Sequence, residues 1–293
     1  MKRYILNKLH RKLIAGSIKK KKAAVNSWNK QSSFEYGINR TEERKEKIIL
    51  SMTTFTKRLP TIHICLKSLI NQSVKADRII VWLGPDVNPA DITEKMKNLE
   101  QYGVEYRFVD TDLKPHKKYF YAMQEFSKSC VITVDDDVIY EKDMVKTLVN
   151  THKKYPEAVC ARRVHCIFLK DGRILPYNKW MQDCRSITKP SFRLVPTGVG
   201  GVLYPPNLFS NIAFDKEKII DTCFEADDIW LKFMELIHKV PVVWVKCLLT
   251  EPPVIRSAQK FALCNTNVVK SKNDIYIENM VKEYPKVIEL LRK

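Results

Sequence analysis

Long apolar stretches are missing from this sequence of 293 residues. No run approaches the roughly 20 apolar residues of a membrane-spanning helix. Charged residues interrupt every apolar stretch near the N-terminus, so the roughly 7 to 15 residue core of a signal peptide is missing as well. The eight cysteines include no Cys-x-x-Cys pair. Without a secretory signal we expect them to be reduced, in a cytoplasmic protein. The spacing of Cys160, His165 and Cys166 matches no zinc module.

Acidic residues are absent from positions 1–30, where ten Lys or Arg contribute +10 of the net charge of +18. Apolar residues recur there at helical spacing: Ile5, Leu6, Leu9, Leu13, Ile14 and Ile18. This pattern is typical of a basic amphipathic helix on an anionic membrane surface. We therefore expect peripheral contact with the inner face of the cell membrane. A disordered tail, or a helix packed on the domain, is the alternative.

One predicted buried strand is followed directly by three acidic residues. Residues 131–134, Val-Ile-Thr-Val, precede Asp135, Asp136 and Asp137. A run of β-formers without polar alternation predicts a strand buried on both faces. Ligands bind at the carboxyl edge of an open α/β sheet. Three neighbouring carboxylates repel unless a cation neutralises them, and oxygen ligands suit Mg²⁺ or Mn²⁺. A solvated acidic turn is the alternative.

Strands and helices alternate before this cluster. We predict strands at 47–53, 79–83 and 104–109, and helices at 60–71, 89–102 and 115–126. This alternation indicates a mostly parallel sheet with helices on both faces. After the cluster we predict a helix at 140–155, a strand at 158–168, an Asp-Gly hairpin turn at 170–173, a strand at 241–245 and a helix at 275–291. The sheet is then mixed.

The apolar strand followed by Asp-Asp-Asp and Tyr140, with this order of elements over residues 47–245, resembles the Asp-X-Asp motif of GT-A fold glycosyltransferases of the bacterial surface-polysaccharide type. The resemblance implies an α/β, Rossmann-like, mixed and mostly parallel sheet flanked by helices. Residues 1–46 would form the basic arm and linker. Residues 47–293 would form a single domain, with 47–140 binding the nucleotide sugar and 141–293 the acceptor. The family's usual late metal-binding His is not evident.

The resemblance also implies which ligands the protein binds and which residues bind them. Asp135 and Asp137 would hold Mn²⁺ or Mg²⁺ on the diphosphate of a nucleotide-sugar donor, with a UDP-sugar favoured. A basic cluster just before the acidic one suits a pyrophosphate, with Lys118 and Tyr119 as the preferred pair. A solvated basic helix face is the alternative. The full set of expected donor-binding residues is Thr53, Thr54, Phe55, Arg58, Lys118, Tyr119, Asp135 and Asp136.

Glycine is scarce, with eight residues in the chain, yet Gly198, Gly200 and Gly201 fall within four positions. Glycine lets backbone approach a ligand closely, so this loop suits a sugar pocket. No helix follows the glycines, which excludes a Rossmann fingerprint and a P-loop. In GT-A enzymes a glycine-rich stretch after the metal motif shapes the donor-sugar and acceptor pocket. A tight turn between strands is the alternative.

Asp227 and Asp228 begin a predicted amphipathic helix. Acidic residues there can simply stabilise the helix N-terminus. A carboxylate fixed near the donor's anomeric carbon can also accept a proton from an acceptor hydroxyl. The segment resembles the acidic pair that carries the base in many inverting GT-A enzymes. We expect Asp228 to be the base, with Asp227 as the second choice, and neighbouring Glu225 and Asp227 to raise its proton affinity.

The leading hypothesis is a metal-dependent, inverting transfer of a sugar to a glycan or lipid-linked glycan acceptor of capsule, lipopolysaccharide or a similar polymer. A metal-dependent phosphohydrolase is one alternative, although the second His and Asp cluster of a two-metal site is not evident. A basic nucleic-acid-binding protein is the other, suggested by the charge of +18. Most of that charge lies in the arm, and no nucleic-acid motif is present, so we expect no nucleic-acid partner.

Overall fold

The computed structural model describes residues 34–247, 252–255, 257–258 and 272–292. The basic arm at positions 1–30 lies outside the described residues. No helix in the described ranges is both long enough and apolar enough to span a membrane.

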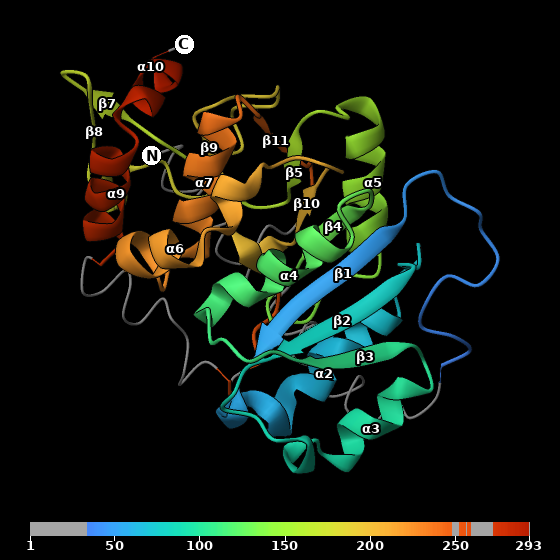
Figure 1. Cartoon of the computed structure of the whole chain (residues 1–293). Coiled ribbons are helices and arrows are strands. Elements are labelled where there is room, and N and C mark those ends of the chain that lie inside the picture. The colour runs from blue at the N-terminus through green and yellow to red at the C-terminus, as the bar shows by residue number, and fades with distance from the viewer. Residues whose placement is uncertain (1–33, 248–251, 256, 259–271, 293) are drawn as a thin grey trace, which may run out of the picture.

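A seven-stranded sheet forms the centre of the fold (Figure 1). Its strand order is β11-β5-β10-β4-β1-β2-β3. Strand β10 runs antiparallel to both of its neighbours, and every other pairing in the sheet is parallel. The predicted mixed, mostly parallel sheet is therefore confirmed. The strands are β1 Ile48–Thr54, β2 Arg78–Leu83, β3 Val104–Phe108, β4 Cys130–Thr133, β5 Val159–Ala161, β10 Val202–Tyr204 and β11 Val242–Trp244.

Helices cover both faces of the sheet, as the alternation predicted. On one face, Leu50 and Met52 of β1 share a core with α2, α3 and α5. On the other face, Ile49 packs with Ala122 of α4. Helices α6, α7 and α9 lie together beside the second half of the sheet (Figure 1). The helices are α2 Leu59–Ile70, α3 Glu94–Glu100, α4 Lys117–Glu125, α5 Met144–Lys154, α6 Lys216–Cys223, α7 Asp227–Ile237, α9 Lys272–Glu283 and α10 Ile288–Leu291.

The predicted strand at 158–168 is wrong as one element. The chain leaves the main sheet after β5 and forms β6 Val164–Cys166, which pairs with β9 Leu194–Pro196 in a second sheet. The break falls at Arg162, whose guanidinium pairs with Glu141. The hairpin prediction is confirmed by β7 Leu169–Lys170 and β8 Arg173–Ile174. Asp171 (φ 50°) and Gly172 (φ 75°) supply the positive φ values of its turn.

Two predicted helices are broken. The stretch 89–102 divides because Thr93 caps α3, its side chain accepting a hydrogen bond from the Met96 amide. The stretch 275–291 begins earlier, at Lys272, and is interrupted at Pro285, whose ring nitrogen has no hydrogen to donate. Short 3₁₀ turns are η1 Thr56–Arg58, η2 Pro89–Asp91, η3 Lys114–His116, η4 Tyr177–Lys179, η5 Gly198–Gly200, η6 Asn211–Phe214 and η8 Pro285–Val287.

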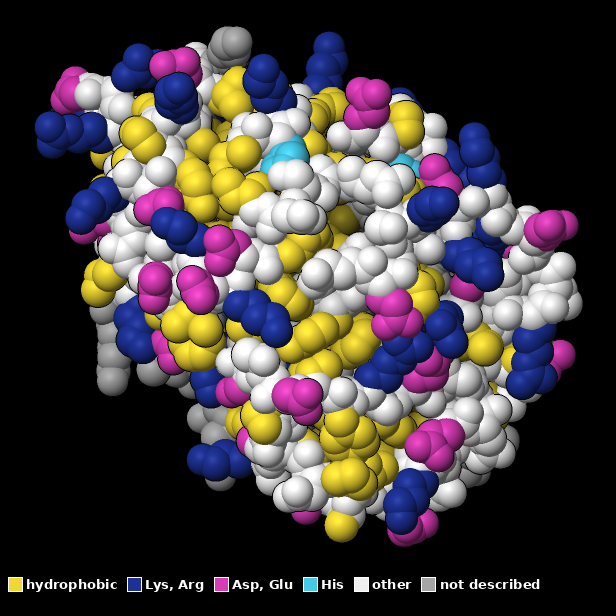
Figure 2. All heavy atoms as spheres, viewed as in Figure 1, with side chains coloured by type: hydrophobic (Ala, Val, Ile, Leu, Met, Phe, Trp, Pro, Cys, Tyr) yellow, Lys and Arg dark blue, Asp and Glu magenta, His cyan; other side chains and the backbone are white. Residues whose placement is uncertain are grey.

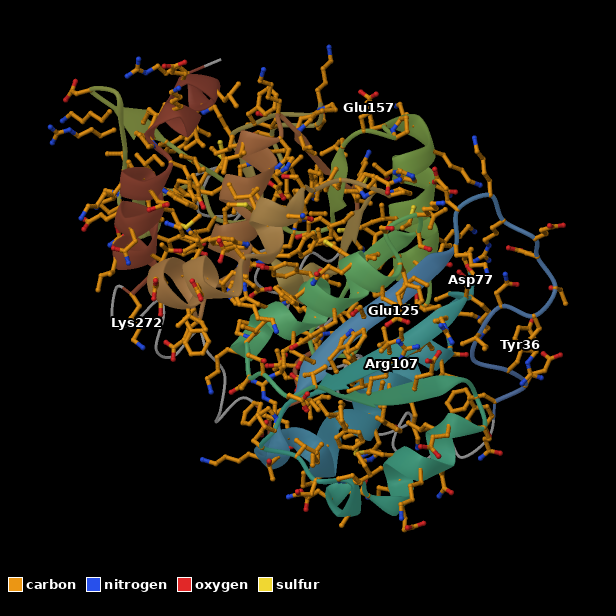
Figure 3. All side chains as sticks on the ribbon, in the orientation of Figure 1. Tyr36, Asp77, Arg107, Glu125, Glu157 and Lys272 are labelled. Carbon is orange, nitrogen blue, oxygen red and sulfur yellow. The ribbon has the colours of Figure 1, made fainter. Side chains whose placement is uncertain are left out.

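The described part of the linker, 34–46, is held against the domain by specific contacts. Asp77, labelled in Figure 3, accepts hydrogen bonds from the Asn39 side chain and the Ile48 amide, each 2.7 Å long. Arg44 pairs with the same carboxylate at 3.2 Å. Phe34 packs edge-on against Tyr102, with 5.3 Å between ring centroids. The approach to β1 is therefore fixed by specific contacts.

Candidate active site

The functional side chains gather at the carboxyl edge of β1 and β4. Parallel strands end at the same edge, so the loop after β1 lies beside the Asp cluster after β4. Strand β10 is antiparallel to β4, with Val202 opposite Thr133. The loop that precedes β10 therefore reaches this edge too, and it carries the three glycines.

Asp136, the middle residue of the cluster, holds two loops together. Its side chain is only 4% exposed. One carboxylate oxygen accepts a hydrogen bond from the Thr54 hydroxyl at 2.6 Å, and the other pairs with the Arg58 guanidinium. Burial raises the pKa of Asp136, while Arg58 and Thr54 oppose that rise. Both Asp136 oxygens therefore have partners within the protein, and contact of Asp136 with the donor stays a prediction.

Asp135 and Asp137 are more accessible than Asp136. Their side chains are 28% and 12% exposed. Asp137 pairs with Arg58 at 3.1 Å, yet burial, followed by repulsion from Asp135, raises the pKa of Asp137 to about 6. The Asp135 amide donates to the Tyr140 hydroxyl at 2.7 Å, which fixes the turn of the loop. These two carboxylates are thus held in place while keeping access to solvent.

Lys118 joins the cluster to the second acidic pair. Its ammonium lies 2.7 Å from an Asp135 oxygen and 3.0 Å from an Asp227 oxygen. Burial disfavours this charge, but Asp135 and Asp227 together raise the pKa of Lys118 above its ordinary value. Lys118 is therefore a buried, permanently charged link between the end of β4 and the start of α7. A solvated helix face does not describe its position.

Gly198 lies at the centre of these groups. Its amide donates to the two Asp228 oxygens, at 3.2 and 3.4 Å. A Cβ atom at this position would lie 2.7 Å from the Lys118 ammonium and 2.9 Å from an Asp135 oxygen. Real Cβ atoms essentially never come so close, so any larger residue here would displace the ends of the Lys118 and Asp135 side chains. Gly201 has φ 85°, and a Cβ on Gly200 would lie 2.9 Å from the Arg163 amide. The segment is a tight turn that also reaches the acidic cluster.

Asp228 is partly buried at the first turn of α7. Burial, followed by repulsion from Asp227, raises the pKa of Asp228 to about 8, against the opposing effect of Lys118. Glu225 is not among the largest causes of this rise, and its expected contribution stays a prediction. The Glu225 carboxylate is instead held by Lys272 at 2.5 Å and by the Tyr276 hydroxyl at 3.2 Å, both from α9 (Figure 3).

Three expected donor-binding residues have other contacts. Tyr119 is fully buried, with its hydroxyl 3.1 Å from His116 Nδ1, so it supports the site from within the core. Thr53 donates its hydroxyl hydrogen to the Trp82 carbonyl at 2.8 Å and joins β1 to β2. Phe55 is partly exposed, and the Arg58 guanidinium lies 5.3 Å from its ring centroid. Thr53 and Phe55 are both partly exposed, and contact of these three residues with the donor stays a prediction.

Two residues of the site gave no motif in the sequence. The Arg163 guanidinium donates to the Thr197 hydroxyl at 3.1 Å, next to the glycine turn. Burial, and then the charge of Asp228, raise the pKa of the Tyr177 phenol. Its ring packs on Trp180, with 4.9 Å between centroids. In the sequence, the signal that could have indicated Tyr177 was a pair of aromatic residues within a polar loop.

The cluster fits a divalent cation bound through two protein carboxylates. Arg58 and Lys118 pair with its carboxylates, but the pKa values of Asp137 and Asp228 stay raised. An additional positive charge, such as a metal ion, would therefore stabilise the ionised form of these carboxylates. Within the described ranges, one group of three His, Cys, Asp or Glu side chains has its ligand atoms within 4.8 Å of one another. That group lies outside this cluster. Mg²⁺ and Mn²⁺ commonly use one or two carboxylates and complete their coordination with water and phosphate.

Replacing Gly198 with Ala is expected to lower activity with little loss of stability. The new methyl group would push aside the tips of Lys118 and Asp135, which are flexible side-chain ends, so the backbone need not move. We expect kcat to fall by at least about 10²-fold, because a displacement of about 1 Å has costs of that size. Steady-state kinetics and thermal unfolding measure the two effects.

Val199→Ala is the matched control, since it shortens a side chain in the same turn and adds no atom near the cluster. Normal turnover of the Gly198→Ala variant would contradict the close approach inferred at Gly198.

The model of the family described as Glycosyl transferase family 2 matches residues 49–202. A search of curated protein sequences found no match. One similar solved structure is the mannosyltransferase PcManGT from Pyrobaculum calidifontis in complex with GDP-Man and Mn²⁺, at 11% identity and a TM-score of 0.42. That alignment covers 82% of this chain and 63% of the mannosyltransferase, so the chain spans less than two thirds of it.

A second similar structure is a CMP:2-keto-3-deoxy-manno-octonic acid synthetase complexed with CTP. It shares 13% identity with a TM-score of 0.43, and the alignment covers 78% of this chain and all of that one.

Proposed function

Because this chain belongs to glycosyl transferase family 2, we propose that it transfers a sugar from a nucleotide-diphosphate donor to a glycan acceptor with inversion at the anomeric carbon. One observation carries the proposal: Asp135 and Asp228 flank the same residue, Gly198. The carboxylate that would bind the metal ion and the one that would act as general base therefore lie close to the same glycine. The division into a donor half, 47–140, and an acceptor half, 141–293, is part of the proposal.

At the donor end, Asp135 and Asp137 would hold Mn²⁺ or Mg²⁺. When bound, such an ion offsets the negative charge of the departing diphosphate. Arg58 has a second task, because its pairing with Asp136 and Asp137 fixes the loop that presents these carboxylates. Lys118 holds Asp135 from the other side. We favour a UDP-sugar as the donor.

At the acceptor end, Asp228 would take the proton from the attacking hydroxyl. Direct displacement needs a base on the side opposite the leaving diphosphate. The Gly198 amide orients the Asp228 carboxylate. Its raised pKa, about 8, suits a base that works near neutral pH. The partly exposed ring of Tyr177, backed by the buried Trp180, is the surface on which the acceptor sugar would pack.

A screen of nucleotide sugars tests the donor assignment. A ligand at 100 times its dissociation constant adds about 2.7 kcal/mol to the free energy of unfolding, which thermal unfolding detects. We expect one donor to stabilise the protein only with Mn²⁺ or Mg²⁺ present. Product analysis then decides the reaction. A nucleoside diphosphate and an extended glycan support the proposal, whereas release of free phosphate would indicate a phosphohydrolase.

The basic arm supplies a proposal about location. Residues 1–30 would attach a cytoplasmic enzyme to the inner membrane face, where a lipid-linked glycan acceptor resides. Each Lys or Arg near an anionic surface contributes about 1 kcal/mol. Deleting residues 1–30 is expected to release the protein from anionic vesicles in a co-sedimentation assay and to preserve activity on a soluble acceptor. Vesicles of neutral lipid are the control, and unchanged binding to anionic vesicles would contradict this role.

Nucleic-acid binding is not favoured by the described surface. Outside residues 1–30 the chain carries a net charge of only +8. In Figure 2 basic and acidic side chains are interspersed over the face shown, and no continuous basic area covers the described residues there. A nucleic-acid backbone requires clustered positive charge.

A further inference from the structure

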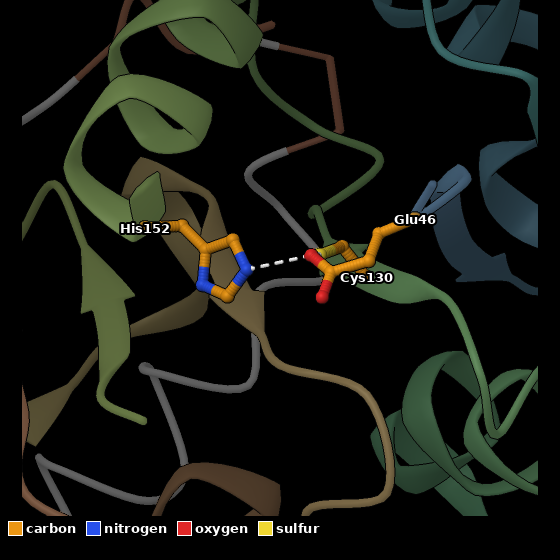
Figure 4. A group of neighbouring side chains, drawn as sticks. All are labelled: Glu46, Cys130 and His152. Carbon is orange, nitrogen blue, oxygen red and sulfur yellow. Dashed lines mark hydrogen bonds and ion pairs between the residues drawn. The ribbon is translucent and has the colours of Figure 1, made fainter. Parts of the chain in front are cut away.

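A second group of potential metal ligands lies at the opposite edge of the sheet from the acidic cluster. Glu46 precedes β1 by two residues, Cys130 is the first residue of β4, and His152 lies in the last turn of α5 (Figure 4). The Cys130 amide donates to the Lys47 carbonyl at 2.8 Å, so the segments bearing Glu46 and Cys130 are already joined. Three elements distant in sequence thus converge on one point.

The three ligand atoms are close to the spacing that a metal ion requires. His152 Nε2 lies 3.0 Å from a Glu46 oxygen, and Cys130 Sγ lies 3.6 Å from the same oxygen. All three atoms lie within 4.8 Å of one another. Zinc bonds of about 2.0 to 2.3 Å in a tetrahedron place ligand atoms roughly 3.3 to 3.8 Å apart. Side-chain adjustments of up to about one ångström would therefore bring all three atoms to the spacing of zinc ligands.

The chemistry of the group differs from that of the acidic cluster. A thiol, an imidazole and a carboxylate together suit the borderline-soft Zn²⁺, whereas carboxylates alone suit Mg²⁺ or Mn²⁺. Cys130 and His152 are buried, but the Glu46 side chain is 43% exposed. The exposed carboxylate leaves a path to solvent and room for a water molecule as the fourth ligand.

We propose that Glu46, Cys130 and His152 bind one Zn²⁺ ion that fastens the beginnings of β1 and β4 to α5. As the ion binds, the Cys130 thiol releases its proton to solvent and the imidazole coordinates through Nε2 with its hydrogen on Nδ1. That Nδ1 is buried and has no hydrogen-bond partner within the described residues. The Zn²⁺ affinity of this site is therefore lower than that of a closed site, which has four protein ligands and a complete set of supporting hydrogen bonds.

Cobalt spectroscopy tests the site on the full chain, because a thiolate bound to Co²⁺ gives a charge-transfer band in the near ultraviolet that oxygen ligands do not give. We expect one equivalent of Co²⁺ to produce this band in protein kept reduced with a non-thiol reagent. Cys130→Ser should abolish the band, and Cys184→Ser, at a buried cysteine outside the group, should keep it. Absence of the band in the wild type, or its persistence in Cys130→Ser, would overturn the proposal.

A second variant covers the case in which Cys130→Ser does not fold. Glu46 is exposed, so Glu46→Gln removes a ligand without disturbing the core. We expect its Zn²⁺ affinity, measured by competition with a chromophoric chelator, to fall at least about tenfold. Glu42→Gln, an exposed change in the same linker, should leave the affinity unchanged. Equal affinity in the wild type and Glu46→Gln would show that the three side chains form a hydrogen-bonded group only.

Discussion

Asp228→Asn is expected to lower kcat by about 10² to 10⁴-fold and to leave donor affinity unchanged, since general base catalysis contributes that much. Asparagine keeps the size of the side chain and an oxygen for the Gly198 amide, but it cannot accept the proton of the acceptor hydroxyl. Kinetics with saturating donor, together with calorimetric donor binding, separate the two effects. Asp221→Asn, an exposed change on α6, is the control.

The pH dependence offers a second readout of the same variant. Only the ionised carboxylate is a base, so wild-type kcat/KM should rise with pH through the free enzyme's pKa of about 8, and Asp228→Asn should lose this rise. The folded-state pKa lies above the ordinary value of 3.8. The stability that protonated Asp228 contributes is therefore complete below the unfolded pKa and is lost as pH rises through about 8. Near pH 8 the variant should unfold at a higher temperature than the wild type.

Two outcomes would contradict the assignment of Asp228. A product with retained configuration would exclude direct displacement aided by a base. Near-normal turnover of Asp228→Asn would leave the carboxylate with only its structural contacts, to the Gly198 amide and at the first turn of α7.

Asp135→Ala is expected to lower transfer by about 10³-fold or more and to abolish metal-dependent donor binding. A metal ion at the departing diphosphate contributes several kcal/mol, and each 1.4 kcal/mol is about tenfold in rate. The fold should persist, because removing one carboxylate relieves repulsion on Asp137 and Lys118 keeps Asp227 as a partner. Asp137→Ala should behave similarly, with some loosening of Arg58.

Thermal unfolding with donor, in the presence and absence of Mn²⁺, measures this effect. Glu157→Gln, an exposed change at the end of α5 (Figure 3), is the control for loss of one negative charge. Marked unfolding of Asp135→Ala with unchanged donor affinity would show that Asp135 is a structural residue and that the metal binds elsewhere.

The sheet and the location of the acidic cluster could be predicted because their signals are local. A continuous apolar run predicts a strand buried on both faces, and the carboxylates that follow it then mark the strand's carboxyl edge. The strands around Ile49 and Ile132 therefore occur nearly where their sequences indicate. The Asp-Gly turn at 171–172 was equally local, because positive φ values restrict the residues that fit.

The differences between the predictions and the structure arise from contacts between residues that are distant in sequence. Nothing near residue 162 indicates that Arg162 pairs with Glu141 and that the strand ends there. Lys118 and Tyr119 were expected to act as a pair, but consecutive helical residues point about 100° apart. One therefore faces the carboxylates while the other enters the core. Glu225 likewise turns toward Lys272 of α9, a contact between segments that no motif connects.

The position of β10 determines when the site can form during synthesis. Strands β1 to β4 lie within residues 48–133, and their parallel pairings need only crossovers of moderate length. Gly198 and Asp227 are synthesised later. Contacts between segments that are distant in sequence form slowly. On the ribosome we expect the first four strands to collapse before the glycine turn and α7 dock against them. A chain interrupted before residue 227 could then hold a folded sheet and its acidic cluster yet lack any capacity for transfer, so incomplete products of translation would not consume donor.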